Sequence, residues 1–279
     1  MNNKIPYQLF GNQDLQNCLF LHGNGFPPLA YKSFLNNLSK KMSVYAMTQR
    51  PFWKTDINPN SIKNWDIFKN DILDFIDQNN LQNSIGVGHS MGGVLILLIE
   101  ITKPGTFKKI FLLDPVITSI FKSLLYKLLF QVSIIDFIHP MIAATNRKKM
   151  IFQTKEMMYQ SYRKKEIFSK INDSSLMNYI ESIIYEDKKH VKIKISQKWE
   201  NTIYRSGSMH DIKIWNNLNK INCPSFVILP KEKQFGHFNY GSNLRLKNLR
   251  FQNFFINNVS HLFPIERPNK AAEIILSNL

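Results

Sequence analysis

Short apolar runs alternate with longer amphipathic segments over most of this 279-residue chain. Most of the runs lack the strict alternation of a half-exposed strand, as expected for strands of a parallel sheet that is covered on both faces. The pattern therefore predicts an α/β fold with a mostly parallel central sheet and helices on both faces. The predicted strands are 18–23, 43–48, 84–89, 109–114, 225–230 and 249–255, and the predicted helices between the first of them are 30–41, 64–79 and 91–102.

The alternation stops after Asp114, where a long helical pattern rich in Lys, Met, Phe and Tyr begins. It resumes near residue 206. We therefore expect a core formed by residues 1–114 and 206–279, with a helical cap, or lid, inserted at 115–205.

The first part of this insertion, 116–138, is strongly apolar but contains Lys122, Lys127 and Asp136. A charge in the centre of a membrane helix costs about 2.5–3.5 kcal/mol, so an amphipathic lid is the better interpretation. Its apolar side chains are expected to roof a pocket, while a plain core helix of a second subdomain is an equally consistent alternative. The residues expected to form this roof are Phe121, Leu125, Leu128 and Phe130.

A serine between glycines joins a predicted strand to a predicted helix. The sequence GVGHSMGG (86–93) contains Gly-x-Ser-x-Gly centred on Ser90. In a nucleophile elbow of this kind the serine occupies a strained turn, and the glycines allow the strand and the helix to approach closely. Ser90 is therefore the candidate nucleophile.

The loop that follows the first strong strand, LHGNGFP (21–27), is a second candidate for the same site. Acyl transfer requires two hydrogen-bond donors that point at the developing oxyanion. We assign these to the backbone N–H groups of Asn24 and Met91. His22 is expected to be a structural hydrogen-bonding residue beneath the loop rather than a base.

A nucleophilic serine needs a base, and seven histidines compete for that role. In proteins with this elbow the triad follows the order Ser, acid, His, which favours a histidine after the last strand. His261 in NNVSHLFPIERP fits this position and His237 is the second choice, while His89 is expected to point away along its strand. The remaining four are His22, His139, His190 and His210.

Two carboxylates compete for the role of the acid. Asp114 ends the predicted strand KIFLLD, just before Pro115. Glu232 lies in PKEKQFG, the loop in which such an acid usually occurs, but its register is off by a residue. We favour Asp114, which has a structural alternative as the N-cap of the first cap helix.

Composition argues against several other classes of protein. The formal net charge is +16, but the lysines are mostly scattered, so no nucleic-acid partner is expected.

The two cysteines, Cys18 and Cys223, lie in apolar runs and are expected to be buried free thiols. No signal-peptide pattern is seen, so the cytoplasm is the default compartment. No metal-ligand spacing and no phosphate-binding glycine loop occurs, so no cofactor or metal is expected.

The motifs HGNGFP, GVGHSMGG, LLDPV and HLFPIERP, together with RPFW (50–53), resemble those of the α/β-hydrolase family of serine esterases. They look like a bacterial subfamily of capped hydrolases whose substrates are mostly unassigned. RPFW stands where many relatives have a glycine-rich segment, which implies a different pocket shape. Haloalkane dehalogenases and epoxide hydrolases share the fold but use an aspartate nucleophile, so Ser90 argues against both reactions. Some dehalogenases resemble this chain in placing the triad acid at the end of the strand that corresponds to KIFLLD here.

The expected function is hydrolysis of a carboxylic ester or thioester of a small, largely apolar acyl or aromatic substrate, with Ser90, His261 and Asp114 as a catalytic triad. The same scaffold also supports acyltransferases and C–C hydrolases, so a reaction does not follow from the fold. A non-catalytic ligand-binding protein is the alternative from another class. Peripheral contact of the basic, amphipathic lid with a membrane is a further alternative that we do not favour, and the oligomeric state is left open.

Overall fold

The computed structural model describes residues 4–53, 55–186, 189–232 and 240–279. Within these residues the main sheet has seven strands in the order β1-β3-β2-β4-β5-β9-β10. Only β1 is antiparallel to its neighbour, and the other pairs are parallel. The strands are β1 (Tyr7–Phe10), β2 (Gln16–Leu21), β3 (Met42–Met47), β4 (Ser84–His89), β5 (Phe107–Leu113), β9 (Ser225–Pro230) and β10 (Phe251–Ile256).

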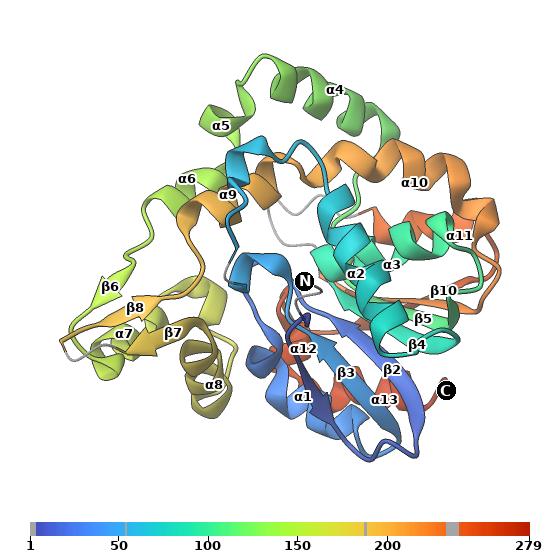
Figure 1. Ribbon diagram of the computed structural model, residues 1–279, viewed down its shortest axis with the longest axis horizontal. Coiled ribbons are helices and arrows are strands. Elements are labelled where there is room, and N and C mark those ends of the chain that lie inside the picture. Colours follow the sequence, from blue (N-terminus) through green and yellow to red (C-terminus); the bar gives the residue numbers. More distant parts are fainter. Residues whose placement is uncertain (1–3, 54, 187–188, 233–239) are drawn as a thin grey trace.

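The predicted α/β architecture is confirmed, and each predicted strand lies within two residues of an observed one. The helices that flank the sheet form two groups. α1 packs against α12 and α13, whereas α2 and α10 pack against α3 (Figure 1). These helices are α1 (Lys32–Leu38), α2 (Asp66–Gln78), α3 (Met91–Thr102), α10 (Asp211–Asn217), α11 (Leu244–Lys247), α12 (Phe263–Glu266) and α13 (Pro268–Leu276).

The centre of the molecule is the pair β4 and α3. Every residue of β4 and eleven successive residues of α3, Met91–Ile101, are buried. α3 is apolar around its whole circumference, as expected for a helix that is enclosed on all sides. Its one carboxylate, on Glu100, accepts hydrogen bonds from the backbone N–H groups of Gly105 (2.7 Å) and Phe107 (3.0 Å). These bonds fix the loop that leads into β5.

Residues 115–205, which we call the cap segment, lie outside the main sheet (Figure 1). A small antiparallel sheet, β6-β8-β7, accompanies the helices of this segment and was not predicted. Its strands are too short to show a pattern in the sequence. The elements are α4 (Ile120–Gln131), α5 (Ile135–Ile138), α6 (Pro140–Asn146), β6 (Ile151–Phe152), α7 (Lys155–Arg163), α8 (Asp173–Ile183), β7 (Ile184–Glu186), β8 (Val191–Ile193) and α9 (Gln197–Arg205).

The apolar stretch 116–138 forms two helices rather than one. α4 ends at Gln131, and Ser133 then takes a positive φ of 57° before α5 begins. Among the residues that the structure describes, no helix is both long enough and apolar enough to cross a bilayer.

Candidate active site

Ser90 lies at the turn between β4 and α3. Its backbone has φ 56° and ψ −117°, a region that a residue with a side chain rarely occupies. Its N–H group donates to the carbonyl of Leu113 at the end of β5 (2.9 Å). This hydrogen bond to the neighbouring strand therefore stabilises the strained backbone of Ser90, as is typical of functional turns.

The two glycines that flank Ser90 in the motif are required by close backbone contacts. A Cβ atom on Gly88 would lie 2.4 Å from the carbonyl oxygen of Gly92, and a Cβ on Gly92 would lie 2.1 Å from that of Leu21. Both distances are shorter than any real Cβ contact, so only glycine allows α3 to start this close to β2 and β4.

Asp114 and His261 are in contact, although 147 residues separate them. The Asp114 carboxylate follows β5 directly, is 1% exposed, and places Oδ2 2.6 Å from Nδ1 of His261. The backbone N–H of Asp114 donates to Ile228 in β9 (2.9 Å), which fixes the residue on the sheet despite its positive φ of 45°. Because the carboxylate only accepts hydrogen bonds, the proton lies on Nδ1 of the imidazole. Nε2 is then the ring nitrogen that carries no proton and can accept one.

The loop that carries His261 is fixed by the carboxylate of Glu266 in α12. Glu266 accepts hydrogen bonds from the backbone N–H of Ser260 (2.8 Å) and from the Ser260 hydroxyl. The Ser260 oxygen in turn accepts from the N–H of Leu262 (3.1 Å). These bonds hold the residues on both sides of His261, so the imidazole approaches Asp114 from a rigid turn.

His89 does not point away along its strand as expected, because its ring lies 4.8 Å from the ring of His261. Its Nε2 atom is 2.9 Å from the carbonyl oxygen of His261, and its Nδ1 atom is 2.7 Å from the hydroxyl of Tyr31. A carbonyl only accepts, so Nε2 carries the proton and Nδ1 accepts from Tyr31. The Tyr31 oxygen accepts from the N–H of Gly23 (3.2 Å). One chain of hydrogen bonds thus links the His261 loop to the loop after β2.

The other acid candidates have different partners. Glu232 is exposed, and its Oε2 atom accepts a hydrogen bond from the backbone N–H of Asn258 (2.9 Å). Asp114 is not the N-cap of the first cap helix, because Ser119 occupies that position and accepts from the N–H of Lys122 (3.3 Å). His237, the second choice for the base, lies outside the described residues.

The loop after β2 brings one of the two expected oxyanion donors, Asn24, close to Ser90. A Cβ atom built on Gly23 would lie 3.3 Å from Cβ of Ser90, and Asn24 is the next residue of the loop. Met91 is the first residue of α3, where backbone N–H groups have no intrahelical acceptor. The Asn24 side chain, which sequence reasoning ignored, donates from Nδ2 to the carbonyl of Glu200 in α9 (3.2 Å). This bond connects the loop to the cap segment.

His22 has the structural role expected of it. It is 2% exposed, its Nε2 atom accepts from the N–H of Gln49 (3.0 Å), and its Nδ1 atom is 2.8 Å from the carbonyl of Gly23. Burial lowers its pKa to about 4, so the ring is neutral near pH 7. His139 likewise accepts a hydrogen bond from the backbone N–H of Met141, and His210 accepts one from that of Trp65.

On the cap side, aromatic rings and one buried ion pair surround the loop after β2. The ring of Phe26 stacks on that of Tyr179 at 4.6 Å. Nζ of Lys148 lies 2.5 Å from Oε1 of Glu200, and these side chains are 13% and 7% exposed. The same Glu200 oxygen would lie 3.4 Å from a Cβ on Gly25. A paired charge therefore lies within van der Waals distance of the candidate oxyanion loop.

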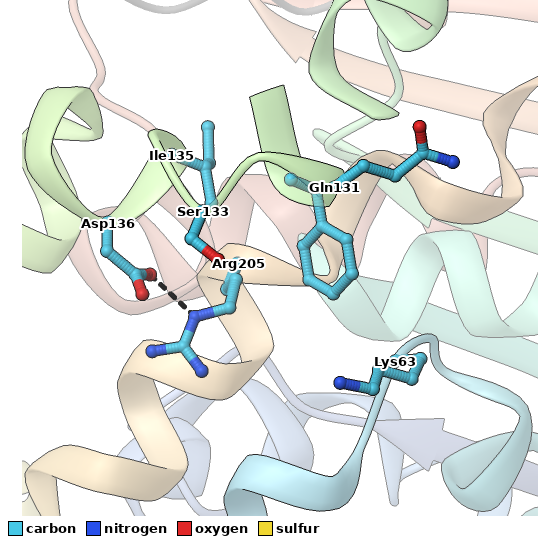
Figure 2. Close-up of a pocket in the computed structure, with 7 residues that line it drawn as sticks. Lys63, Gln131, Ser133, Ile135, Asp136 and Arg205 are labelled. Atoms are coloured by element: carbon cyan, nitrogen blue, oxygen red, sulfur yellow. Dashed lines mark hydrogen bonds and ion pairs between the residues drawn. The ribbon is translucent and has the colours of Figure 1, made fainter. Parts of the chain in front are cut away.

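The four side chains expected to roof the pocket do not do so. Three of them are largely exposed: Phe121 at 75%, Leu125 at 48% and Leu128 at 57%. Phe130 lines a cavity of about 310 Å³ between α4, α5 and α9, together with Lys63 and the ion-paired Asp136 and Arg205 (Figure 2). The apolar face of α4 turns outward because Ser123 on its opposite face is bonded to the buried Asp211 (3.1 Å).

Both cysteines are buried and free, as expected from their apolar surroundings. Burial raises the pKa of the Cys223 thiol to about 11 and that of Cys18 still further. Neither thiol is therefore a thiolate near neutral pH. Among residues 4–53, 55–186, 189–232 and 240–279, no group of three or more His, Cys, Asp or Glu side chains is arranged to hold a metal ion.

Comparison with known proteins places this geometry in a family. The model of the serine aminopeptidase S33 family of hydrolases matches residues 13–232. The protein named "Uncharacterized hydrolase YugF" of Bacillus subtilis (strain 168) is 21% identical over 273 residues, which are 97% of this chain and 92% of YugF.

Two solved structures share the fold over nearly the whole chain. The thioesterase domain from the curacin biosynthetic pathway has a TM-score of 0.74 at 15% identity and covers 98% of this chain and 100% of its own. E-2-(acetamidomethylene)succinate hydrolase has a TM-score of 0.75 at 13% identity and covers 98% of this chain and 94% of its own. The chain thus belongs to the serine aminopeptidase S33 family of α/β-fold hydrolases.

Proposed function

We propose that this hydrolase cleaves a carboxylic ester or thioester of a small, largely apolar substrate through an acyl-enzyme on Ser90. The observation that carries the proposal is the 2.6 Å contact between Asp114 and Nδ1 of His261, beside a serine in a strained elbow. An imidazole that is oriented through Nδ1 can accept a proton at Nε2.

In the proposed reaction the Ser90 oxygen attacks the carbonyl carbon while His261 takes the hydroxyl proton. The oxyanion accepts hydrogen bonds from the N–H groups of Asn24 and Met91. His261 then gives its proton to the leaving oxygen or sulfur, which departs and leaves the acyl group on Ser90. A water molecule attacks the acyl-enzyme by the same route in reverse, with His261 as base, and releases the acid. Asp114 stays ionised and stabilises the imidazolium in both steps.

The surroundings of the serine support an apolar acyl or aromatic group. Phe26, Phe168 and Tyr179 form a cluster with ring centroids 4.6–6.4 Å apart next to the candidate oxyanion loop. Phe168 and Tyr179 are each 3% exposed, so the partly exposed Phe26 is the ring of this cluster that is left to contact a substrate. Aromatic side chains of this kind bind apolar surface and aromatic rings.

The test is the Ser90→Ala variant assayed with p-nitrophenyl esters of increasing chain length. We expect the wild-type protein to hydrolyse the short and aromatic esters and the variant to lose on the order of 10⁴-fold or more in kcat, with an unchanged unfolding midpoint. Unchanged turnover in the variant would remove Ser90 from the mechanism.

A fluorophosphonate probe separates the enzyme from a ligand-binding protein on the same scaffold. It reacts with a serine only when a base activates the hydroxyl. Labelling of the folded wild-type chain, absent in Ser90→Ala, supports the acyl-enzyme. A folded wild-type chain that resists the probe contradicts it and favours the binding protein.

A further inference from the structure

The outer helices of the cap segment carry an unusual concentration of exposed apolar side chains. α4 and α5 form the outermost layer at the top of Figure 1, with no other element outside them. Phe121 is 75% exposed and Phe137 is 85% exposed. A soluble surface normally carries such residues singly, so their concentration on one segment indicates an interaction site. The exposed set is Ile120, Phe121, Leu124, Leu125, Leu128, Val132, Ile134, Phe137, Ile138 and Met141.

The exposed residues of α4 lie on one side of that helix. Successive residues are rotated by about 100°, so positions 120, 121, 124, 125 and 128 cover a single stripe. Ser123 lies on the opposite side, where it is buried and bonded to Asp211. The helix therefore presents this apolar stripe outward, while Ser123, Tyr126 and Phe130 lie on its inner side.

One lysine borders the stripe, and a second lies farther round the helix. With the same rotation per residue, Lys127 projects roughly 90° from the centre of the stripe. Lys122 projects roughly 130° from the centre on the other side, and its Nζ atom lies 5.3 Å from the centre of the Tyr240 ring. In helices that lie in a membrane interface, lysines at the border of an apolar stripe extend their ammonium groups toward the lipid headgroups. Lys127 of α4 matches that arrangement.

The segment that carries these residues is strongly basic. Between Ile120 and Met150 there are five Lys or Arg residues and one acid, Asp136. Asp136 is 35% exposed and pairs with Arg205 in α9 (2.5 Å), as Figure 2 shows. One of the five basic residues, Lys148, is paired with Glu200. The segment thus combines exposed apolar side chains with an excess of positive charge.

We propose that the face formed by α4 and α5 binds the surface of an anionic lipid bilayer. The apolar side chains would enter the acyl boundary, Lys127 would contact the headgroups, and the net positive charge of the segment would attract the anionic surface. A second copy of this chain fits the face less well, because two faces of the same positively charged segment would repel each other. The binding is peripheral, since no described helix is long enough to span a bilayer.

The experiment measures co-sedimentation of the full-length chain with vesicles of phosphatidylcholine, with and without 30% phosphatidylglycerol. We expect binding to the anionic vesicles, weak or no binding to the neutral ones, and a marked loss of binding in 0.5 M NaCl. The Phe121→Ser/Phe137→Ser variant should bind at least tenfold more weakly, because both side chains are exposed and contribute little to the fold.

The matched control is Leu246→Ser/Leu249→Ser. These residues are 81% and 87% exposed but lie in and after α11, outside the cap segment. The control should bind like the wild type. Equal binding by both double variants, or no binding to anionic vesicles, would overturn the proposal. So would a dimer in sedimentation velocity that Phe121→Ser/Phe137→Ser abolishes while vesicle binding is absent. No step of this test requires turnover, so it stands or falls separately from the proposed hydrolysis.

Discussion

The core side and the cap side of the candidate active site are held in place by different kinds of interaction. On the core side, backbone contacts fix the residues: Gly92 touches β2, Ser90 bonds to Leu113, and Asp114 bonds to β9. On the cap side, long side chains fix them: Lys148 reaches Glu200, and Asn24 reaches the carbonyl of Glu200. A site built in this way has a rigid half for chemistry and an adjustable half for the substrate. Substitutions should therefore have different consequences in the two halves.

The largest effect is expected for Asp114→Asn on the core side. The amide would orient His261 with the wrong tautomer, so kcat should fall by about 10⁴-fold while the fold is retained. Ester hydrolysis and thermal unfolding would be measured on the same sample. Glu232→Gln is the matched control, because Glu232 bonds to Asn258 instead, and its activity should stay near wild type. A loss confined to the Glu232 variant would reverse the assignment.

The Gly92→Ala substitution tests the backbone contacts directly. The new Cβ would lie 2.1 Å from the carbonyl of Leu21, so α3 must move away from β2. We expect a loss of about 4 kcal/mol or more in the free energy of unfolding, measured with urea. Gly207→Ala is the control, since its Cβ would meet Trp65 at an ordinary 3.5 Å. If both variants are equally stable, the close approach at the elbow is not needed.

On the cap side, Glu200→Gln leaves the Lys148 ammonium buried without its partner. Breaking such a pair should cost about 3 kcal/mol in unfolding free energy and disturb the loop of Asn24. The double variant Lys148→Met/Glu200→Gln removes both charges and should recover most of the loss. If the double variant is no more stable than Glu200→Gln alone, the unpaired lysine is not the cause.

The smallest expected effect is the pH dependence of the unfolding free energy that comes from His210, which lies between α2 and α10. Burial lowers the pKa of His210 to about 4, and Asp66 only partly opposes this. The unfolded chain binds a proton near pH 6.5 whereas the folded chain does not. Stability is therefore complete above pH 6.5 and is lost as the pH falls toward 4. At pH 5 the loss from this residue should be about 2 kcal/mol.

The His210→Gln variant isolates that contribution. Its amide oxygen can accept the N–H of Trp65 but does not titrate. The fall in unfolding free energy between pH 7 and pH 5 should be about 2 kcal/mol smaller than in the wild type. Burial also lowers the pKa of His22 to about 4. Because His22 titrates in both proteins, its contribution to the pH dependence cancels in the comparison. An identical pH dependence in both proteins would show that His210 is not buried as a neutral ring.

The fold could be predicted from the sequence wherever a strand is apolar on both faces. β4 and β5 are such strands, and their predicted positions match the structure to within two residues. β1 was missed because it has four residues and lies at the edge of the sheet, paired only with β3. The strands of the cap sheet have two or three residues, too few for any period to be visible.

The site was predictable where local geometry forces a residue type. Only glycine fits at positions 88 and 92, so the motif that forms the elbow can be recognised from the sequence alone. The chain of hydrogen bonds from Gly23 through Tyr31 and His89 to His261 was not predictable. Directly bonded members of this chain are up to 172 residues apart in the sequence, and no spacing rule connects them.

The sequence by itself determined the α/β layering, the elbow at Ser90 and the buried strand that ends at Asp114, because each depends on neighbours along the chain. Only the tertiary structure decided that Asp114 rather than Glu232 contacts His261, and that the apolar stripe of α4 faces outward. The physical reason is the same in both cases. Period and propensity show which side of an element is apolar, but only the packing of distant segments decides which side is buried and which carboxylate reaches the ring.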